Sequence, residues 1–289
     1  MHSITDVEIK SLELKAESIR ESIIKMLLEA GSGHTAGPLG MADILTCLYF
    51  KLLNHDPKNP NWENRDKFIL SNGHTAPVLY AAMAHSGYFP VSELKTLRKF
   101  GTRLQGHPHR ETLPGIENSS GPLGSGLSQA IGMALADRVM NSGKKLIPKY
   151  FYVMMGDGEI NEGQVWESLL LLNKYKLNNV ITFIDRNTIQ IDGFTENVLP
   201  LDSIADKMKA FNFNVIEIDG HNMREIVSAV NKAKSILNQS TIIIAHTIPG
   251  KGVVEFEGDF KWHGKAPNGD EAKIALKELR TLRGKIKEE

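Results

Sequence analysis

The chain alternates between segments with helical and with strand-like hydrophobic patterns. Apolar residues recur at helical spacing through residues 5–29, where Thr5 and Glu8 have the spacing of a capping box and Gly31 follows the last turn. Further helical patterns cover residues 41–53, 75–86, 92–100, 126–141, 163–175, 202–211, 222–238 and 270–286. Short apolar runs typical of buried strands lie at residues 67–71, 150–155, 180–184, 214–218 and 241–245.

This alternation predicts the fold class. Short apolar strands that alternate with helices form parallel sheets that are covered on both faces. The sequence contains no repeat, low-complexity tract or linker that would divide the chain. We therefore expect one α/β domain over residues 1–289, a doubly wound parallel sheet with helices on both faces, and a glycine-rich stretch, residues 101–126, laid over one edge.

Composition and charge restrict the class of protein. The 289 residues include 34 basic and 34 acidic side chains, a formal net charge of zero, which argues against a nucleic-acid-binding protein. The one cysteine, Cys47, cannot form an internal disulfide. The N-terminus lacks the apolar core of a signal peptide, and no apolar run approaches the roughly 20 residues that span a bilayer. We expect a cytoplasmic protein that binds neither nucleic acid nor membrane.

Glycines and polar residues follow the predicted strands. Ligands of doubly wound sheets bind beyond the carboxyl ends of the strands. Four of the ten histidines directly follow a glycine, which permits close backbone approach, and histidine titrates near neutral pH. The segments that follow the strands predict a substrate cleft at this edge: Asn72-Gly73-His74, Gly156-Asp157-Gly158-Glu159, Asp185-Arg186-Asn187, Asp219-Gly220-His221 and His246-Thr247.

Asp157 and Asn187 form the most specific pair at this edge. If their strands are neighbours, about 4.8 Å apart, a carboxylate and an amide oxygen can converge on one hard cation, Mg²⁺ or Ca²⁺. Gly156 and Gly158 would let a phosphate approach, and a helix from residue 163 would point its positive end nearby. The alternative interpretation is that residues 156–158 are a turn and Asn187 is a loop residue.

Longer strings carry a family resemblance. GDGEINEG, followed by a helix, a strand and DRNTIQIDG, resembles the thiamine diphosphate motif. Four other strings resemble landmarks of transketolase, in the same order as in that family: SGHTAGPLGMADILTCLYF, RDKFILSNGHTAPVLYA, GTRLQGHPHRETLPGIENSSGPLGSGLSQAIGMALAD and KWHGKAPN. The resemblance covers the chain from about residue 30 to residue 268 and is closest to the N-terminal subunit of split transketolases.

The resemblance implies a thiamine diphosphate cofactor held through Mg²⁺ or Ca²⁺. It implies metal ligation by side-chain oxygens of Asp157 and Asn187 and by the carbonyl oxygen of Ile189. Ile191 is expected to pack beside the thiazolium ring. The cofactor-binding residues that it implies are Gly121 and Leu123 at the aminopyrimidine, with Gly156, Asp157, Gly158, Glu159, Asn187, Ile191 and His74.

The resemblance also implies an activity. It implies transfer of a two-carbon ketol unit from a ketose phosphate to an aldose phosphate, as in the pentose phosphate pathway, with carbanion stabilisation supplied by the cofactor. Proton transfers to and from oxygen suit groups that titrate near neutrality. His34, His74, His107 and His263 match the family's four active-site histidines. We expect His74 and His107 near the donor substrate, and His34 and His263 near the acceptor.

Other positions carry weaker expectations. Glu162 resembles a carboxylate at the family's subunit interface, and the alternative is capping of a helix N-terminus. Lys251 matches a lysine near the substrate cleft. Thr35-Ala36 stands where the family usually has Pro-Gly after the first histidine, and Arg186 adjoins the expected metal ligand without an evident purpose.

Transketolase needs a second domain, which presents a glutamate to the aminopyrimidine. Only 26 residues follow His263, too few to encode it. We therefore expect an α2β2 assembly with a separate subunit that carries the pyrimidine and C-terminal domains. The alternatives are an α-type subunit of another thiamine diphosphate enzyme, acting on a specialised ketose phosphate or a 2-oxo acid, and a non-catalytic regulatory or binding subunit.

Overall fold

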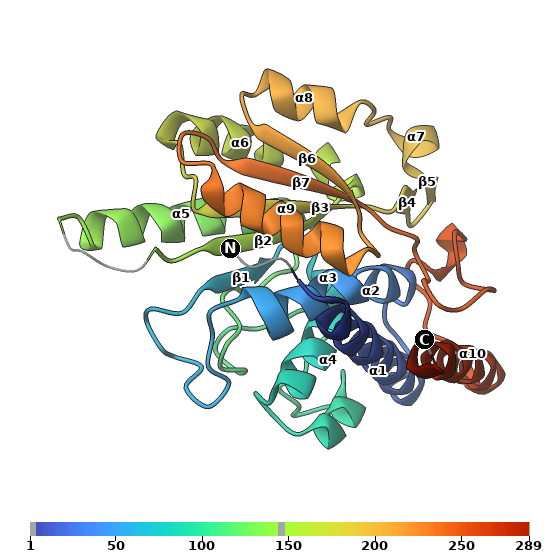
Figure 1. Ribbon diagram of the computed structural model, residues 1–289. Coiled ribbons are helices and arrows are strands. Elements are labelled where there is room, and N and C mark those ends of the chain that lie inside the picture. The colour runs from blue at the N-terminus through green and yellow to red at the C-terminus, as the bar shows by residue number, and fades with distance from the viewer. Residues whose placement is uncertain (1–3, 144–147, 289) are drawn as a thin grey trace.

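Five parallel strands form the central sheet of the chain. The computed structural model describes residues 4–143 and 148–288. The strands lie in the order β1-β2-β3-β7-β6, every neighbouring pair is parallel, and the arrangement is seen in Figure 1. This confirms the α/β fold class, and each strand lies within two residues of its predicted bounds: β1 (Lys67–Leu70), β2 (Phe151–Gly156), β3 (Val180–Arg186), β6 (Asn214–Asp219) and β7 (Thr241–His246).

Helices cover both faces of this sheet. Successive residues of a strand point to opposite faces, so Tyr152 and Met154 of β2 join one buried core, whereas Val153 and Met155 join the other. The first core is closed by α1 (Asp6–Ala30), α3 (Ala42–Cys47), α4 (Ala76–Ser86) and α9 (Met223–Ser235). The second core is closed by α5 (Ser125–Met140), α6 (Gly163–Tyr175) and α8 (Ile204–Ala210).

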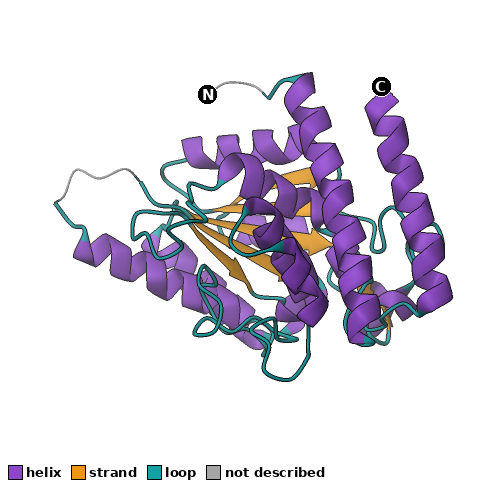
Figure 2. Cartoon of the chain, turned by 90° about the horizontal axis from the view of Figure 1, so that it is seen from below, coloured by secondary structure: helices purple, strands orange, loops and turns teal. Residues whose placement is uncertain are grey.

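Both long terminal helices pack side by side. The first helix, α1, begins at the predicted capping box, in which Thr5 N donates to Glu8 Oε2 (2.9 Å) and Glu8 N donates to Thr5 Oγ1 (3.3 Å). It ends before Gly31, whose φ of 65° suits glycine. Figure 2 shows α10 (Gly269–Glu288) lying along α1. Among the described helices, none combines the length and apolar character needed to cross a membrane.

Three local expectations were wrong. Residues 92–100 contain only a 3₁₀ helix, Val91–Thr96, because the chain then reverses: Arg98 takes a φ of 59° and its N–H donates to Leu104 O. Residues 30–40, where no helix is expected, contain α2 (Ala36–Gly40). The helix expected over residues 41–53 is α-helical only through α3 and continues as a π-helix, Leu48–Leu52.

A small hairpin that the sequence did not predict lies beyond the sheet. It consists of β4 (Ile189–Gln190) and β5 (Gly193–Phe194), and α7 (Thr195–Val198) follows directly. Figure 1 places all three beyond the carboxyl end of β3. Two-residue strands have too little sequence for a period-2 pattern, so hydrophobic spacing cannot identify them.

Candidate functional site

A cavity of about 420 Å³ lies at the carboxyl ends of β1, β2 and β3. Strands β2 and β3 are neighbours with Gly156 paired to Asp185, as the expectation for Asp157 and Asn187 requires, and both residues line this cavity. The lining residues include every predicted cofactor, metal and histidine position and exclude Glu162: His34, His74, His107, Gly121, Leu123, Gly156, Asp157, Gly158, Glu159, Asn187, Ile189, Ile191 and His263.

Four histidines from distant parts of the chain line the cavity. The ring centroids of His34 and His74 lie 4.7 Å apart, those of His34 and His263 5.5 Å, and those of His74 and His263 5.3 Å. The His107 ring completes the group, because its Cδ2 lies 3.3 Å from the position a Cβ atom on Gly73 would take. The tertiary fold thus builds the expected histidine group.

The Gly-His dipeptides have a steric cause. A Cβ atom on Gly73 would clash with the side chain of Ser120, and one on Gly106 would lie only 3.0 Å from Arg98 Nε. These two glycines therefore allow the loops that carry His74 and His107 to approach their neighbours. Gly220-His221 shares the pattern but lies outside the cavity, so the pattern alone does not identify a site residue.

Burial favours the neutral form of all four histidines. Burial lowers the pKa of each of them, to about 4 for His34 and well below the ordinary value for His74, and their mutual charge adds to this for His34 and His74. A neutral imidazole offers one donor and one acceptor. The Nδ1 atoms of His34 and His263 are buried and have no hydrogen-bond partner among the described residues.

Thr35, which stands where the transketolase pattern usually has proline, makes a hydrogen bond that explains this departure. Its buried hydroxyl donates to the carbonyl oxygen of Lys265 at 2.5 Å. This hydrogen bond ties the segment that carries His34 to the segment that carries His263, and a proline at this position cannot make it.

We expect Thr35→Val to leave the Lys265 carbonyl without this partner and to cost about 1–3 kcal/mol of stability, because an unsatisfied buried acceptor is expensive. The loosened segments are also expected to raise the KM for substrate. Thr35→Ser keeps the hydroxyl and serves as the matched control. Equal thermal stability and equal KM for the two variants would show that the hydrogen bond has no role.

Asp157 is positioned by three hydrogen bonds. Its Oδ2 accepts from Thr188 N (2.7 Å) and from Arg186 Nη1 (3.1 Å), and its Oδ1 accepts from Gly158 N (2.8 Å). A carboxylate oxygen accepts about two hydrogen bonds, so Oδ1 keeps a free direction. Burial raises the pKa of the Asp157 carboxyl, which means that a cation beside it would be favourable.

Asn187 is oriented by a residue that the sequence did not assign. Asn187 Nδ2 donates to Asp185 Oδ2 (2.6 Å), and Thr247 Oγ1 donates to Asp185 Oδ1 (2.5 Å). Asn187 Oδ1 accepts from Ile189 N at 3.1 Å. Burial raises the pKa of Asp185 to about 7. Asp185 directly precedes Arg186 and Asn187 at the carboxyl end of β3. This position beside the expected metal ligand was the signal in the sequence that could have identified it.

Glu159, Gly121 and Ile191, three further positions expected to bind the cofactor, also line the cavity. Glu159 holds two loops together: its Oε1 accepts from Ser71 Oγ and from Gly124 N (2.6 Å), and its Oε2 accepts from Gly156 N (3.1 Å). Nothing lies within 4 Å of the position that a Cβ on Gly121 would take. The Ile191 side chain is 66% exposed at the mouth.

The oxygen ligands and glycines that line the cavity fit a diphosphate held by a hard cation. Among residues 4–143 and 148–288 no group of three or more His, Cys, Asp or Glu side chains could hold a metal alone. Mg²⁺ in proteins commonly takes one or two carboxylates and completes its shell with water and phosphate oxygens. Asp157 and Asn187 supply oxygen ligands of this kind, and glycines leave room for the phosphates.

Other expected positions lie outside the cavity. Glu162 is exposed and occupies the N-cap position of α6, but its side chain makes no capping hydrogen bond. Lys251 lines a separate groove against α10. His221 bridges Asp43 Oδ2 (2.8 Å) and the N–H of Ile248 (2.8 Å), which gives it a structural contact.

Comparisons with known proteins agree with this geometry. Residues 12–283 match the family model for the thiamine diphosphate binding domain of transketolase. The chain is 41% identical over 268 residues to the 6-deoxy-6-sulfo-D-fructose transketolase subunit of Clostridium sp. (strain MSTE9), covering 93% of this chain and 96% of that protein. It is 36% identical over 283 residues to an apulose-4-phosphate transketolase subunit of Phocaeicola vulgatus, covering 98% and 99%.

Solved structures of longer transketolases share the fold. The Campylobacter jejuni enzyme superposes with a TM-score of 0.83 at 33% identity, and a Pichia stipitis enzyme with 0.86 at 30%. The match covers 96% of this chain in both cases but only 48% and 46% of those chains, so this chain spans less than half their length. The family model and the near full-length relatives together show that the chain belongs to the transketolase family, as its thiamine diphosphate binding domain.

Proposed function

We propose that this chain is the diphosphate-binding subunit of a two-subunit transketolase that transfers a two-carbon ketol unit between sugars. One observation carries the proposal: four histidines whose pKa is lowered by burial line the same cavity as an oxygen-ligand pair, Asp157 and Asn187. The relatives that match over nearly their whole length are themselves named as transketolase subunits.

The chain's own residues have separate roles in this proposal. Asp157, Asn187 and the Ile189 carbonyl hold Mg²⁺ or Ca²⁺ and through it the diphosphate, and Gly158 approaches the phosphates by its backbone. Bound thiamine diphosphate supplies the carbanion stabilisation that ketol transfer needs. The four histidines hydrogen-bond the sugar's hydroxyl and carbonyl oxygens and exchange protons with them, which their neutral form permits.

The substrate class follows from the same cavity and from the relatives. One relative is named for 6-deoxy-6-sulfo-D-fructose and two for apulose 4-phosphate, which are sugars with an anionic group. We therefore propose a ketose with a terminal phosphate or sulfonate as the donor. The pentose phosphate pathway stays a prediction from the sequence.

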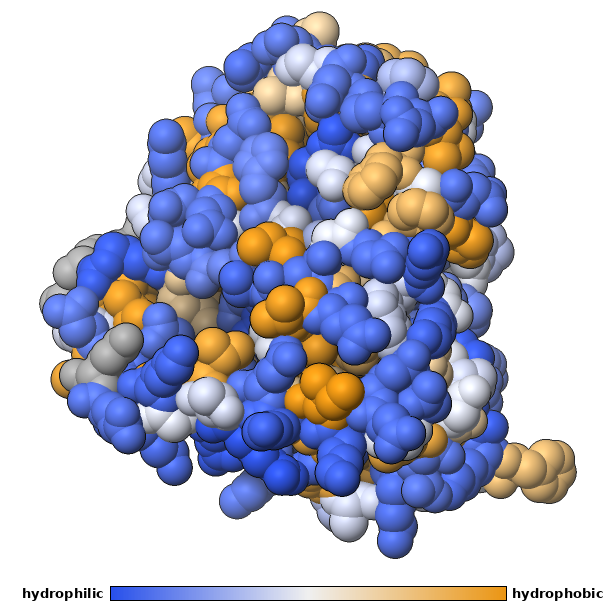
Figure 3. Space-filling model, turned by 90° about the vertical axis from the view of Figure 1, so that its right-hand side faces the viewer, coloured by the Kyte–Doolittle hydropathy of each residue, from blue (hydrophilic) through white to orange (hydrophobic). Residues whose placement is uncertain are grey.

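A partner subunit with the pyrimidine and C-terminal domains belongs to the proposal, as does an α2β2 assembly. Exposed apolar side chains beside the cavity mouth, Ile191, Phe194, Val198 and Leu199, support a covering partner. Figure 3 shows the side of the molecule that carries β4, β5 and α7, where apolar groups alternate with polar ones. The interface role of Glu162, the single domain over residues 1–289 and the cytoplasmic location stay predictions.

The test is a coupled assay with thiamine diphosphate and Mg²⁺, using ketose phosphates, a sulfoketose and a 2-oxo acid as donors. We expect no turnover by the chain alone and ketol transfer once the pyrimidine-domain subunit is added. Turnover by the isolated chain would refute the two-subunit proposal, and turnover of the 2-oxo acid in preference to every sugar would refute the substrate class.

A further inference from the structure

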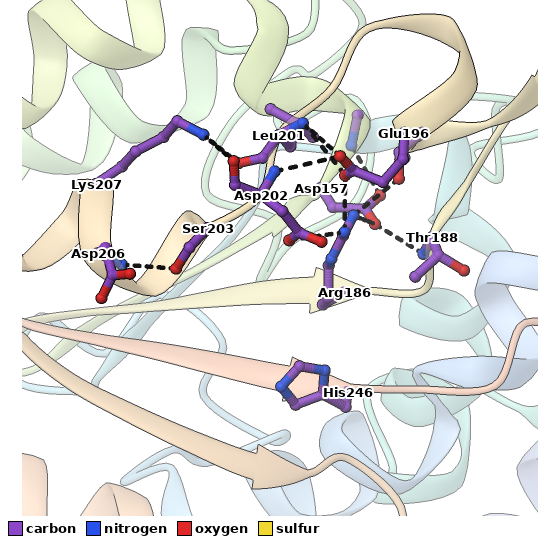
Figure 4. A network of polar contacts seen from close by, with 12 residues as sticks. Asp157, Arg186, Thr188, Glu196, Leu201, Asp202, Ser203, Asp206, Lys207 and His246 are labelled. Atoms are coloured by element: carbon purple, nitrogen blue, oxygen red, sulfur yellow. Dashed lines mark hydrogen bonds and ion pairs between the residues drawn. The ribbon is translucent and has the colours of Figure 1, made fainter.

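Arg186 is a buried cation at the edge of the diphosphate site. Its side chain is only 6% exposed, and it lies between a residue of the cavity and the segment that follows β5 (Figure 4). Nη1 donates to Asp157 Oδ2 (3.1 Å) and to Thr195 Oγ1 (2.8 Å), and Nη2 donates to Glu196 Oε1 (2.8 Å) and to Asp202 Oδ1 (3.0 Å). Every contact of this guanidinium comes from a different residue.

A cation in this place has two opposite effects on metal binding. Its positive charge repels a divalent cation bound at Asp157. Its hydrogen bond occupies Asp157 Oδ2 together with Thr188 N, which fixes the carboxylate plane and leaves the free acceptor direction on Oδ1. The net effect depends on how far the charge is neutralised.

Two carboxylates outside the cavity neutralise that charge. Glu196 and Asp202 contact the guanidinium nitrogen that points away from Asp157, and Glu196 is itself held by the backbone N–H groups of Leu201 and Asp202. The guanidinium is therefore balanced before any metal binds. The orientation of the Asp157 carboxylate by Arg186 then affects metal binding more than the repulsion between Arg186 and the metal does.

We propose that Arg186 is a positioning residue of the metal site, which holds Asp157 so that Oδ1 faces the cation while Glu196 and Asp202 balance its charge. This inference rests on the proposed function, since it requires that Asp157 ligates a metal. It gives a purpose to the arginine that precedes Asn187.

Metal choice separates positioning from a purely structural role. Mg²⁺ demands near-ideal octahedral geometry, whereas Ca²⁺ accepts a flexible ligand shell. A carboxylate that is free to rotate therefore disfavours Mg²⁺ more than Ca²⁺. General loosening of the fold would weaken binding with both ions alike.

The experiment measures thiamine diphosphate binding by calorimetry, in saturating Mg²⁺ and separately in Ca²⁺, to the full chain and to its complex with the pyrimidine-domain subunit. For Arg186→Met we expect the Kd with Mg²⁺ to rise about 10–100-fold, as for other outer partners of metal ligands, and the Kd with Ca²⁺ to rise by a distinctly smaller factor. Arg186→Lys keeps a cationic donor and is expected to recover part of the Mg²⁺ affinity. Asp206→Asn, which changes an exposed carboxylate of α8 that contacts neither Asp157 nor Arg186, is the matched control with little change.

The outcomes distinguish the two proposals. If the wild-type protein binds no thiamine diphosphate with either metal, the proposed function fails, and the inference falls with it. If the wild-type protein binds and Arg186→Met binds equally well or more tightly, positioning does not outweigh repulsion and only the inference is overturned. An equal loss with Mg²⁺ and Ca²⁺ would show a structural role and would also overturn it.

Discussion

Asp157→Ala is expected to abolish metal-dependent binding of thiamine diphosphate, with a Kd raised by more than the roughly 100-fold upper range for outer partners of metal ligands. The substitution removes the oxygen that keeps a free acceptor direction toward the cavity. Arg186 keeps Glu196 and Asp202 as partners, so the fold is expected to persist. Calorimetric titration with the cofactor in Mg²⁺ measures the effect.

Asp219→Ala is the matched control for this variant. Asp219 ends β6 at the same edge of the sheet, but it lies outside the cavity. We expect its cofactor affinity to equal that of the wild type. Unchanged affinity in Asp157→Ala would refute the metal assignment, whatever the control shows.

His263→Ala is expected to lower kcat/KM for ketol transfer by about 10²–10⁴-fold in the complex with the partner subunit, the range for a positioned proton-transfer group. The His263 ring packs within 5.5 Å of His34 and 5.3 Å of His74, and its Nδ1 has no partner among the described residues. The cofactor Kd is expected to change little, because His263 is not among the residues proposed to hold the diphosphate. Steady-state kinetics together with cofactor titration measure this separation.

His246→Ala tests whether any histidine at this edge would have the same effect. His246 ends β7, is half-exposed and contacts Glu217 Oε2 at 3.0 Å, outside the cavity. We expect wild-type kinetics for it. A loss in His263→Ala no larger than in His246→Ala would remove His263 from the catalytic group.

The strands were predictable because burial on both faces leaves a signal in adjacent residues. Runs such as Thr241–His246, whose four central residues are all apolar, alternate with segments of helical spacing, and this alternation defines a parallel sheet. The α1 cap was equally local, since Thr5 and Glu8 satisfy each other's backbone within one turn. The β4–β5 hairpin was not predictable, because two-residue strands are too short to show a period-2 pattern. The 3₁₀ segment Val91–Thr96 was not predictable either, because the chain reversal at Arg98 ends the helix that the hydrophobic spacing favours.

The candidate site divides in the same way. Asp157 and Asn187 were predictable as neighbours, since parallel strands end at one edge and the structure pairs β2 with β3. Asp185 was not recognised, because its role is to orient Asn187 through a hydrogen bond that no spacing records. Lys251 was instead assigned to the wrong place. It was expected near the substrate cleft, but it lines the separate groove against α10.

By itself, the sequence determined the α/β class, the edge of the sheet where polar groups converge and the residue types that suit a metal-bound diphosphate, because these follow from local periodicity and from the ends of parallel strands. Only the tertiary structure decided how the groups act on one another. It brings the ring centroids of His34, His74 and His263 within 5.5 Å of one another, where burial lowers the pKa of each imidazole. It also places Arg186 between Asp157 and two carboxylates, because side-chain charge and hydrogen bonding depend on contacts made across the chain.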